Sequence, residues 1–494
     1  MVVRIRPHRF IGDVRVPASK SHTIRQLLIA SLADGVSEIW YPLDSLDARS
    51  CVSACRIFGA KITERRAVDQ SCPNPADENG EKLIKWTVDG NAGFKKGSLL
   101  SVPAASAVNA SGFPQVDVGN SGTTLYLALA IAALYDRPIE FTGDEQIQSR
   151  SAAPLLDALS GLGIKCRSKR GCAPITIQGP WTGGKVRLPC PTSQYLSALL
   201  IAAPLAPAGT VTEIEVPLLN ERPYIEMTLS YLKEHSIPFE CTPDYSHFLI
   251  KGGYSWKAFS ALNRAALETS GHFPASSRTC GRVPGDFSSA AFPAAAAAIT
   301  GGAVNLLGLN LKDTQGDKFF LEILKEFGCD VQNKERKDAE LIEGVETVVT
   351  ISGKNALKGG IFDLNETPDL LPVVAAVAAF AHGDTTLVNV GHARIKETDR
   401  IAVMAEELAK LGVKCTERED GLIIHGYGGI KPPVAAGERP SVPVLNGHDD
   451  HRIVMALAVA ALGGEAPVEI TGAESAAVTY PGFFDMIEPL AKIG

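Results

Sequence analysis

One pattern recurs six times along this 494-residue chain and limits the fold more than any other feature. Each copy is a short polar segment, a mostly apolar run, and a stop that contains Gly or resembles a turn. Self-similarity of this kind is typical of folds built from repeated supersecondary units. The apolar runs are Gln26–Leu32, Leu125–Leu134, Tyr195–Leu205, Ala290–Ile299, Leu370–Ala381 and Ile453–Leu462.

These runs are predicted to be buried helices, because they are apolar nearly all round and too short to cross a bilayer. Short β-branched segments bounded by turn formers lie between them and predict strands. The strands expected are Ser37–Tyr41, Lys85–Val88, Ile139–Thr142, Val211–Val216, Val304–Leu307, Thr347–Ile351, Thr386–Val390 and Gly421–His425. Second helices are expected at Leu155–Leu162, Ile225–Lys233, Phe319–Phe327 and Arg400–Leu411. We therefore expect an α/β fold with six units of βαβαβ type around buried parallel helices.

The polar segments before the buried helices predict an anion-binding surface. If the helices of each half run parallel, their amino ends converge, and each favours an anion by roughly 0.3–1 kcal/mol. Three copies precede residue 284 and three follow it. Two domains whose polar surfaces face a common anionic ligand are the expected arrangement.

The stretch His392–Arg400 places charges at the start of one second helix. Thr398 and Asp399 are good helix-starting residues, and apolar side chains follow Arg400 at helical spacing. Lys396, Glu397 and Arg400 should then lie close together where backbone N–H groups are unpaired. For an isolated cluster of this kind, a solvated helix start with ion pairs is the more common explanation. The repeated polar caps elsewhere favour an anionic substrate.

Composition narrows the class of protein. A net charge of −7 and a pI near 5.9 argue against nucleic acid or an anionic membrane as the main partner. The first residues lack the apolar segment of a signal peptide, so a cytoplasmic protein is expected. The ten cysteines include no CxxC pair, which indicates neither a zinc site nor a disulfide framework.

Nine blocks in this order resemble the 5-enolpyruvylshikimate-3-phosphate synthase family over nearly the whole chain. They are Pro17-Ala-Ser-Lys-Ser21 with Arg25, Gly119–Thr123, Ser193-Gln194, Arg222-Pro-Tyr224, Gly285–Ser289, Pro368-Asp369, Lys396–Arg400, Asp450-His-Arg452 and Tyr480-Pro481. The resemblance implies two domains of the inside-out α/β prism type. One would comprise residues 1–17 plus 285–494, and the other residues 18–284.

The reaction implied by the resemblance is transfer of the enolpyruvyl group of phosphoenolpyruvate to the 5-hydroxyl of shikimate 3-phosphate, with release of phosphate. No metal, cofactor, nucleic acid or membrane is implied, and a monomer is expected. Such a reaction requires an acid and a base near one ligand pair, with cations to hold a phosphate and a carboxylate.

The resemblance also assigns roles. Asp369 is the expected base at the 5-hydroxyl, and Glu397 assists proton transfer with Lys20 as partner. Arg25 is expected on the shikimate carboxylate, and Gly122 beside phosphoenolpyruvate. Lys396 would bind the shikimate phosphate or hydroxyls, and Arg400 and Arg452 the phosphoenolpyruvate anions. Thr192, Ser193 and Gln194 would surround the shikimate phosphate and ring. The remaining expected substrate contacts are Ser21, Thr123, Tyr224 and His392.

The chain departs from the family pattern at several positions. Tyr126 and Gln146 stand where the family has Arg, Glu221 replaces a Ser that donates to the shikimate phosphate, and Val478 replaces a Lys. Gln146 and Val478 would remove two cations from the phosphoenolpyruvate site, and loss of both without substitutes would weaken phosphoenolpyruvate binding on the order of 10²- to 10⁴-fold. Three explanations stay open: an active synthase in which Arg150 or a Lys compensates, a related transferase with a different acceptor, or a binding protein without turnover.

Two competing motifs are weaker. Gly179–Lys185 has the spacing of a phosphate-binding loop, but Pro180 removes an amide and Val186 stands where a metal-binding Ser or Thr is needed. A turn between strands is expected there. His448-Asp-Asp-His451 carries plausible metal ligands without a further cluster of ligands nearby in the sequence.

Overall fold

The computed structural model describes residues 1–69, 72, 74–76, 79–90, 112–260, 281–337, 345–353, 356–430 and 442–488. The chain divides into two compact units. Unit 1 comprises Met1–Ser19 and Pro284–Gly494, and unit 2 comprises Lys20–Val283. These boundaries lie within two residues of those expected from the sequence. The chain therefore begins in unit 1, builds unit 2, and returns to unit 1.

Unit 2 contains three sheets. One is β3 (Gly35–Trp40), β5 (Lys82–Gly90) and β4 (Lys61–Ala67) in that order. The second is β6 (Gln115–Asp117), β7 (Ile139–Thr142), β9 (Cys172–Gln178) and β8 (Lys165–Lys169). The third is β10 (Gly184–Arg187), β11 (Val211–Glu215), β13 (His247–Lys251) and β12 (Phe239–Cys241). In each four-stranded sheet of unit 2 the first pair is parallel and the last pair is an antiparallel hairpin.

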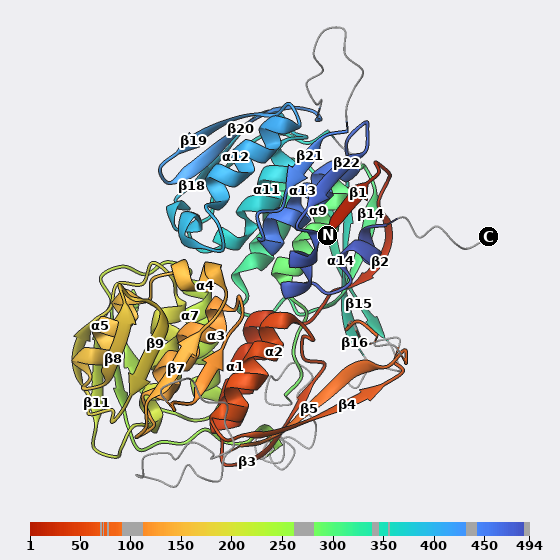
Figure 1. Ribbon diagram of the computed structural model, residues 1–494. Coiled ribbons are helices and arrows are strands. Elements are labelled where there is room, and N and C mark those ends of the chain that lie inside the picture. The colour runs from red at the N-terminus through yellow and green to blue at the C-terminus, as the bar shows by residue number, and fades with distance from the viewer. Residues whose placement is uncertain are drawn as a thin grey trace. The chain divides into compact units, whose positions relative to one another are not determined.

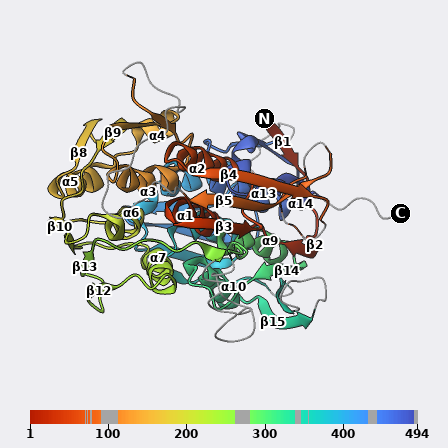
Figure 2. The ribbon, with the colours of Figure 1, turned by 90° about the horizontal axis from the view of Figure 1, so that it is seen from below.

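Three apolar helices lie within these sheets: α1 (Lys20–Leu32), α3 (Gly122–Ala132) and α6 (Gln194–Ala202), which is extended by the turn η1 (Ala203–Leu205). Figure 2 shows them side by side, and every residue of α3 is buried. The other helices of unit 2 are α2 (Leu46–Ile57), α4 (Glu145–Ser149), α5 (Ala153–Gly161) and α7 (Arg222–Glu234). Ser121 caps α3 by accepting the Thr124 N–H, so a polar residue marks the helix start as expected.

Unit 1 repeats the arrangement. One sheet is β2 (Ile11–Arg15), β14 (Ala303–Leu309), β16 (Val345–Ser352) and β15 (Asp330–Lys337) in that order. The second is β17 (Ile361–Asp363), β18 (His382–Val388), β20 (Gly421–Tyr427) and β19 (Lys414–Arg418). The third is β21 (Val444–Asn446), β22 (Val468–Thr471) and β1 (Val2–Ile5). The apolar helices α9 (Phe287–Ile299), α11 (Leu371–Ala378) and α13 (His451–Leu462) lie together among them (Figure 1).

Further helices of unit 1 are α10 (Phe320–Phe327), α12 (Arg400–Lys410) and α14 (Phe483–Ile487). The 3-10 turns are η3 (Gly316–Phe319), η4 (Pro368–Leu370), η5 (Gly391–Ile395) and η6 (Ala473–Val478). Every residue of α11 and α13 is buried, so the prediction of helices without a solvent face is confirmed.

The repeat contains one strand more than the βαβαβ unit expected. The segment from β10 to β13 runs strand, helix, strand, helix, strand, strand, and the segments from β6 to β9 and from β17 to β20 have corresponding strand order. The additional strands have mostly exposed side chains, as in β8 and β19, and therefore lack the apolar run that the prediction relied on. The predicted α/β fold class is confirmed, and each complete unit contains a four-stranded sheet.

Two helix predictions differ from the structure. Helix α1 starts at Lys20 rather than after Arg25, because the polar residues of its first turns contact α7 inside unit 2: His22 Nδ1 lies 2.7 Å from the Tyr231 hydroxyl. Helix α2 was not expected, although Ser45 caps it and its inner face carries buried Cys51 and Cys55. Polar Asp47, Arg49, Ser50 and Ser53 interrupt its apolar periodicity.

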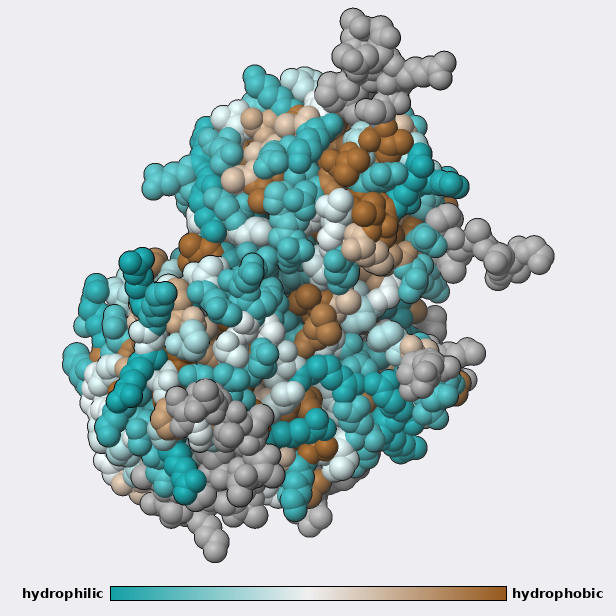
Figure 3. Space-filling model, viewed as in Figure 1, coloured by the Kyte–Doolittle hydropathy of each residue, from teal (hydrophilic) through white to brown (hydrophobic). Residues whose placement is uncertain are grey.

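The face of the molecule in Figure 3 is mainly hydrophilic, with hydrophobic residues in separate small areas. Apolar side chains are instead concentrated in the buried helices and the strand faces around them. Within the described part of the chain, none of the helices is both long and apolar enough to span a bilayer.

Candidate active site

A buried arginine organises the charged residues of unit 1. The Arg400 guanidinium contacts Asp369 Oδ1 at 2.8 Å, Glu397 Oε2 at 2.6 Å and Asp450 Oδ2 at 2.8 Å. Both Arg400 and Asp450 have no exposed surface. Burial alone would lower the pKa of Arg400, but the carboxylates of Asp450, Glu397 and Asp369 outweigh it and raise the pKa. The group stays charged and holds three acids together.

Helix starts position this cluster. Asp399 caps α12 by accepting the Ala402 N–H at 3.0 Å, which makes Arg400 the first residue of the helix. Asp450 caps α13 by accepting the Arg452 N–H at 2.8 Å. Asp369 lies in η4, directly before α11. Because ion pairs connect residues at the starts of α11, α12 and α13, the amino ends of these helices meet in one place.

Asp369 has cations on two sides. Arg452 Nη2 lies 2.8 Å from its Oδ2, and Arg400 Nη1 lies at Oδ1. Burial would raise the pKa of Asp369, but Arg452, Lys396 and Arg400 together lower that pKa well below its usual range. Asp369 is thus ionised at neutral pH, and its strength as a base depends on how closely these cations approach it.

Asp317 in η3 is a second buried acid, and it was not expected from the sequence. Its carboxylate is hydrogen-bonded to the Ser288 hydroxyl in the first turn of α9. Burial, and then repulsion from Asp369, raise the pKa of Asp317 to about 7. The helix start of α9 therefore carries a carboxyl that keeps its proton far more readily than Asp369 does.

Replacing Asp317 with Asn should stabilise the protein above pH 7. Between the unfolded pKa near 4 and the folded pKa near 7, unfolding releases a proton from Asp317, so stability is lost as the pH rises. Each unit of pKa shift is worth about 1.4 kcal/mol, so we expect a gain on the order of 2–4 kcal/mol at pH 8 and little gain near pH 4. Urea unfolding of both proteins at several pH values measures the difference. A gain that does not change with pH would contradict the assignment, and Asp330→Asn at the exposed start of β15 is the control.

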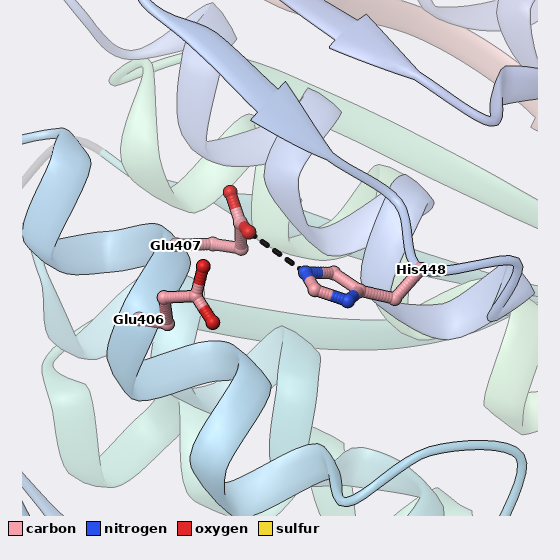
Figure 4. A group of neighbouring side chains, drawn as sticks. All are labelled: Glu406, Glu407 and His448. Atoms are coloured by element: carbon pink, nitrogen blue, oxygen red, sulfur yellow. Dashed lines mark hydrogen bonds and ion pairs between the residues drawn. The ribbon is translucent and has the colours of Figure 1, made fainter.

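Glu407 in α12 fixes the segment that precedes α13 (Figure 4). Its buried carboxylate accepts the Asn446 N–H at 3.0 Å and lies 2.8 Å from His448 Nε2. His448 and Asp449 both have positive φ, a conformation that few residues other than Gly adopt. The Glu407 contacts hold this strained turn and so help to orient Asp450.

Glu407 and His448 also allow a test of the metal site that the motif His448-Asp-Asp-His451 suggested. Among the described residues, Glu406, Glu407 and His448 have ligand atoms within 4.8 Å of one another (Figure 4). However, the Lys410 ammonium lies 3.1 Å from Glu406 and 2.8 Å from Glu407 and already supplies positive charge there. Asp450, from the His448–His451 motif, is engaged by Arg400. The motif is explained by ion pairs and a helix cap.

In unit 2, Arg25 is held rigidly between α1, α6 and α7. Its guanidinium donates to Thr228 Oγ1 at 3.0 Å, to Ser197 Oγ at 3.2 Å and to the Tyr224 carbonyl at 3.4 Å. The Ser21 carbonyl accepts a fourth hydrogen bond at 3.2 Å. These acceptors are neutral, so they orient the side chain without cancelling its charge.

The start of α6 brings together Thr192, Ser193 and Glu221. Glu221 Oε2 accepts from Thr192 Oγ1 at 3.0 Å, from the Ser193 N–H at 2.9 Å and from Ser193 Oγ at 2.8 Å. Gln194 follows as the first helical residue, and its Oε1 is buried without a hydrogen-bond partner among the described residues. The Glu221 carboxylate therefore accepts hydrogen bonds from Thr192 and Ser193, the donors that the family resemblance assigned to the shikimate phosphate and ring.

Gly122 at the start of α3 lies against Arg150. A Cβ at Gly122 would stand 2.8 Å from Arg150 Nη1. Asn120 links Arg150 to Gln146, because Asn120 Oδ1 accepts from Arg150 Nη2 at 3.3 Å and Asn120 Nδ2 donates to Gln146 at 2.7 Å. A cation thus lies beside Gly122 although Gln146 is neutral. Tyr126 instead packs edge-on against Tyr195 in α6, with ring centroids 5.0 Å apart.

Lys20, the first residue of α1, pairs with the buried Asp47 of α2 at 3.1 Å. Thr123 is buried in the first turn of α3, and Tyr224 lies in the first turn of α7. His392 is buried in η5 of unit 1, whereas Val478 ends η6. The residues expected in unit 2 lie at or beside a helix start, apart from Arg25, which lies in the second turn of α1.

Three residues that organise these groups escaped the sequence prediction of site residues: Asp450, Asp317 and Asp47. Asp450 is part of a matching block, and its position before an apolar run is a detectable capping signal. Asp317 and Asp47 lack such a signal, because each is recognisable only from its burial and its partners.

Comparison with known proteins shows the family. The family model for EPSP synthase (3-phosphoshikimate 1-carboxyvinyltransferase) matches residues 6–114 and 91–487. A 3-phosphoshikimate 1-carboxyvinyltransferase of Acetivibrio thermocellus is 40% identical and covers 99% of this chain and 97% of its own. The enzyme of that name from Ruminiclostridium cellulolyticum is 38% identical, covering 99% and 98%. An EPSP synthase structure from Acinetobacter baumannii has a TM-score of 0.70 and 26% identity over 98% of this chain and 97% of that one. With this coverage and this identity, the chain belongs to the EPSP synthase family.

Proposed function

We propose that this chain transfers the enolpyruvyl group of phosphoenolpyruvate to the 5-hydroxyl of shikimate 3-phosphate and releases phosphate. Agreement with the curated relatives over 99% of the chain carries this proposal. The ionised acid Asp369, placed between Arg400 and Arg452, suits it chemically. The 5-hydroxyl oxygen forms a bond to the central carbon of phosphoenolpyruvate as the hydroxyl loses its proton and the methylene carbon gains one. Loss of a proton from the resulting methyl group, with cleavage of the carbon–oxygen bond to phosphate, then restores the double bond and releases phosphate.

Asp369 is proposed to take the proton of the 5-hydroxyl. In the structure its cations hold its pKa low, which makes it a weak base. An anionic substrate bound to Arg452 and Arg400 would compete for these cations and weaken their effect on Asp369. The pKa of Asp369 would then rise toward the range in which a carboxylate accepts a proton effectively. Binding of phosphoenolpyruvate thereby activates the base.

The other residues have supporting roles in the proposal. In unit 1, Glu397 delivers a proton to the methylene carbon of phosphoenolpyruvate, and Lys396 and His392 contact the acceptor. In unit 2, Lys20 is proposed as a further proton-transfer group. In unit 2, Arg25 binds the shikimate carboxylate, and its rigid setting suits recognition of a planar anion. Thr192, Ser193, Gln194 and Tyr224 surround the phosphate and ring, Ser21 and Thr123 complete the binding surface, and Gly122 lies beside phosphoenolpyruvate.

The direct test is incubation of the full chain with phosphoenolpyruvate and shikimate 3-phosphate. Release of inorganic phosphate, together with a product heavier than shikimate 3-phosphate by the enolpyruvyl group, is expected. Unphosphorylated shikimate in place of the acceptor is the control. A chain that binds both substrates but releases no phosphate would refute the proposal and leave a binding protein.

Arg150 is proposed to replace the cation missing at Gln146. Because Arg150 lies beside Gly122, Arg150→Ala should raise the KM for phosphoenolpyruvate on the order of 10- to 100-fold, the loss of one charge-assisted hydrogen bond. The KM for shikimate 3-phosphate should change little. Steady-state kinetics measure both values, and Arg137→Ala, which removes an exposed Arg in the turn after α3, is the control. Equal KM values for phosphoenolpyruvate in the Arg150 variant and the parent chain would assign the compensation to another residue.

A further inference from the structure

Glu221 is an unusual neighbour for a phosphate site. It is 2% exposed, and one of its carboxylate oxygens accepts hydrogen bonds from the Thr192 hydroxyl, the Ser193 hydroxyl and the Ser193 backbone N–H. Backbone and hydroxyl donors at the start of a helix are typical ligands of a bound anion. Here the protein itself provides the anion.

The backbone of Glu221 is adapted to this position. Its φ of 59° and ψ of 42° are left-handed, which is uncommon for a residue with a side chain. Such a conformation persists where surrounding contacts determine it. Glu221 also stands directly before α7, and its carbonyl accepts the Tyr224 N–H at 3.1 Å. Glu221 is therefore held by its backbone at the start of α7 and by its carboxylate at the start of α6.

Thr192 and Ser193 are the groups to which the proposed function assigns the phosphate of shikimate 3-phosphate. Each hydroxyl and each N–H has a single proton to donate. A phosphate and the Glu221 carboxylate cannot both receive these hydrogen bonds. Two anions that share one set of donors also repel each other. The nearby Arg222 guanidinium lies 5.4 Å from the centre of the Tyr245 ring, over its face.

We propose that Glu221 competes with the acceptor phosphate for the donors at the start of α6 and must be displaced when shikimate 3-phosphate binds. This inference rests on the proposed function, since it concerns the same subsite. Glu221 lowers the affinity for the phosphorylated acceptor while it holds the empty subsite in shape. It affects the phosphate subsite and leaves recognition of the shikimate carboxylate, through Arg25, unchanged.

Two variants separate charge from shape. Glu221→Gln keeps an oxygen that can accept the same hydrogen bonds but removes the charge. Glu221→Ser removes the carboxylate and introduces a hydroxyl that can donate to a phosphate. Glu226→Gln, at an exposed position of the same helix α7, is the matched control. Circular dichroism and thermal unfolding establish that each variant is folded.

Isothermal titration of the full chains with shikimate 3-phosphate, and separately with shikimate, tests the inference. We expect Glu221→Gln and Glu221→Ser to bind shikimate 3-phosphate at least about tenfold more tightly, because a charge-assisted competitor is removed. The Kd for shikimate should change by less than about threefold, and Glu226→Gln should match the parent chain. In turnover, Glu221→Ser should lower the KM for shikimate 3-phosphate and leave that for phosphoenolpyruvate unchanged.

Unchanged or weaker binding of shikimate 3-phosphate by both folded variants would overturn the competition. An equal gain in affinity for shikimate would overturn it as well, since the effect would then lie outside the phosphate subsite. The proposed function fails separately. Tight binding by the Glu221 variants without phosphate release from any chain supports the competition but refutes the transferase activity. Turnover by the parent chain, without improved binding in the variants, supports the transferase activity but refutes the competition.

Discussion

Replacing Asp369 with Asn is expected to lower kcat by about 10²- to 10⁴-fold, the usual contribution of a general base. The amide has nearly the same shape and keeps one oxygen that can accept from Arg400 or Arg452, so unit 1 should remain folded. Its nitrogen cannot take the hydroxyl proton. Binding of phosphoenolpyruvate should be retained or strengthened, because Arg452 and Arg400 lose an internal competitor for anions.

Single-turnover and steady-state measurements with both substrates, combined with titration of phosphoenolpyruvate alone, distinguish these effects. Asp384→Asn, at an exposed position of β18, should retain full activity. Near-normal kcat in Asp369→Asn would show that another group accepts the proton. Loss of phosphoenolpyruvate binding with kcat preserved would indicate that Asp369 orients the cations instead.

Arg400→Met should cause the largest loss of stability of any substitution considered. The variant leaves the carboxylates of Asp369, Glu397 and Asp450 close together without their shared cation. Removing one partner of a buried ion pair typically costs about 3–5 kcal/mol, because the remaining charges stay desolvated. Arg400→Lys should fall between Met and the parent chain, since an ammonium lacks the planar fork that reaches several carboxylates.

Urea unfolding at neutral pH measures these differences. Arg394→Ala is the control, because Arg394 pairs with Asp399 and Glu417 near the surface, where an ion pair contributes only about 0.2–1 kcal/mol. A loss of similar size in Arg394→Ala and Arg400→Met would mean that burial of the Arg400 cluster adds no stability. Proton uptake by one of its three acids would be the physical explanation.

The helical core was predictable because its signal is local. The apolar runs that end at Leu205 and at Leu462 form buried helices. Asp399 caps α12, as its residue type predicts. Strand ends were less accurate: β18 covers His382–Val388 rather than Thr386–Val390, since Asn389 takes a positive φ and ends it. Outer strands such as β8 were missed because exposed polar side chains leave little periodicity.

The sequence predicted which residues belong to the charged site better than it predicted the contacts between them. The spacing of Lys396, Glu397 and Arg400 placed them at a helix start, but the partners of Arg400 include Asp369 and Asp450, which are distant in sequence. Glu221 was recognised as a departure from the family pattern, and its hydrogen bonds to Thr192 and Ser193 required three-dimensional information. Burial determines the raised pKa of Asp317, and burial depends on packing from many segments.

The return of the chain to unit 1 has a consequence for biosynthesis. Val2 in β1 pairs with Thr471 in β22, and Ile11 in β2 pairs with Ala303 in β14. At translation rates of about 5–20 residues per second, the partner of β1 leaves the ribosome roughly half a minute to a minute and a half after β1 itself. Unit 2 is contiguous in sequence, so it can fold while the ribosome is still making the rest of unit 1. Strand β1 must therefore remain unaggregated until β22 is synthesised, and β2 until β14 is synthesised.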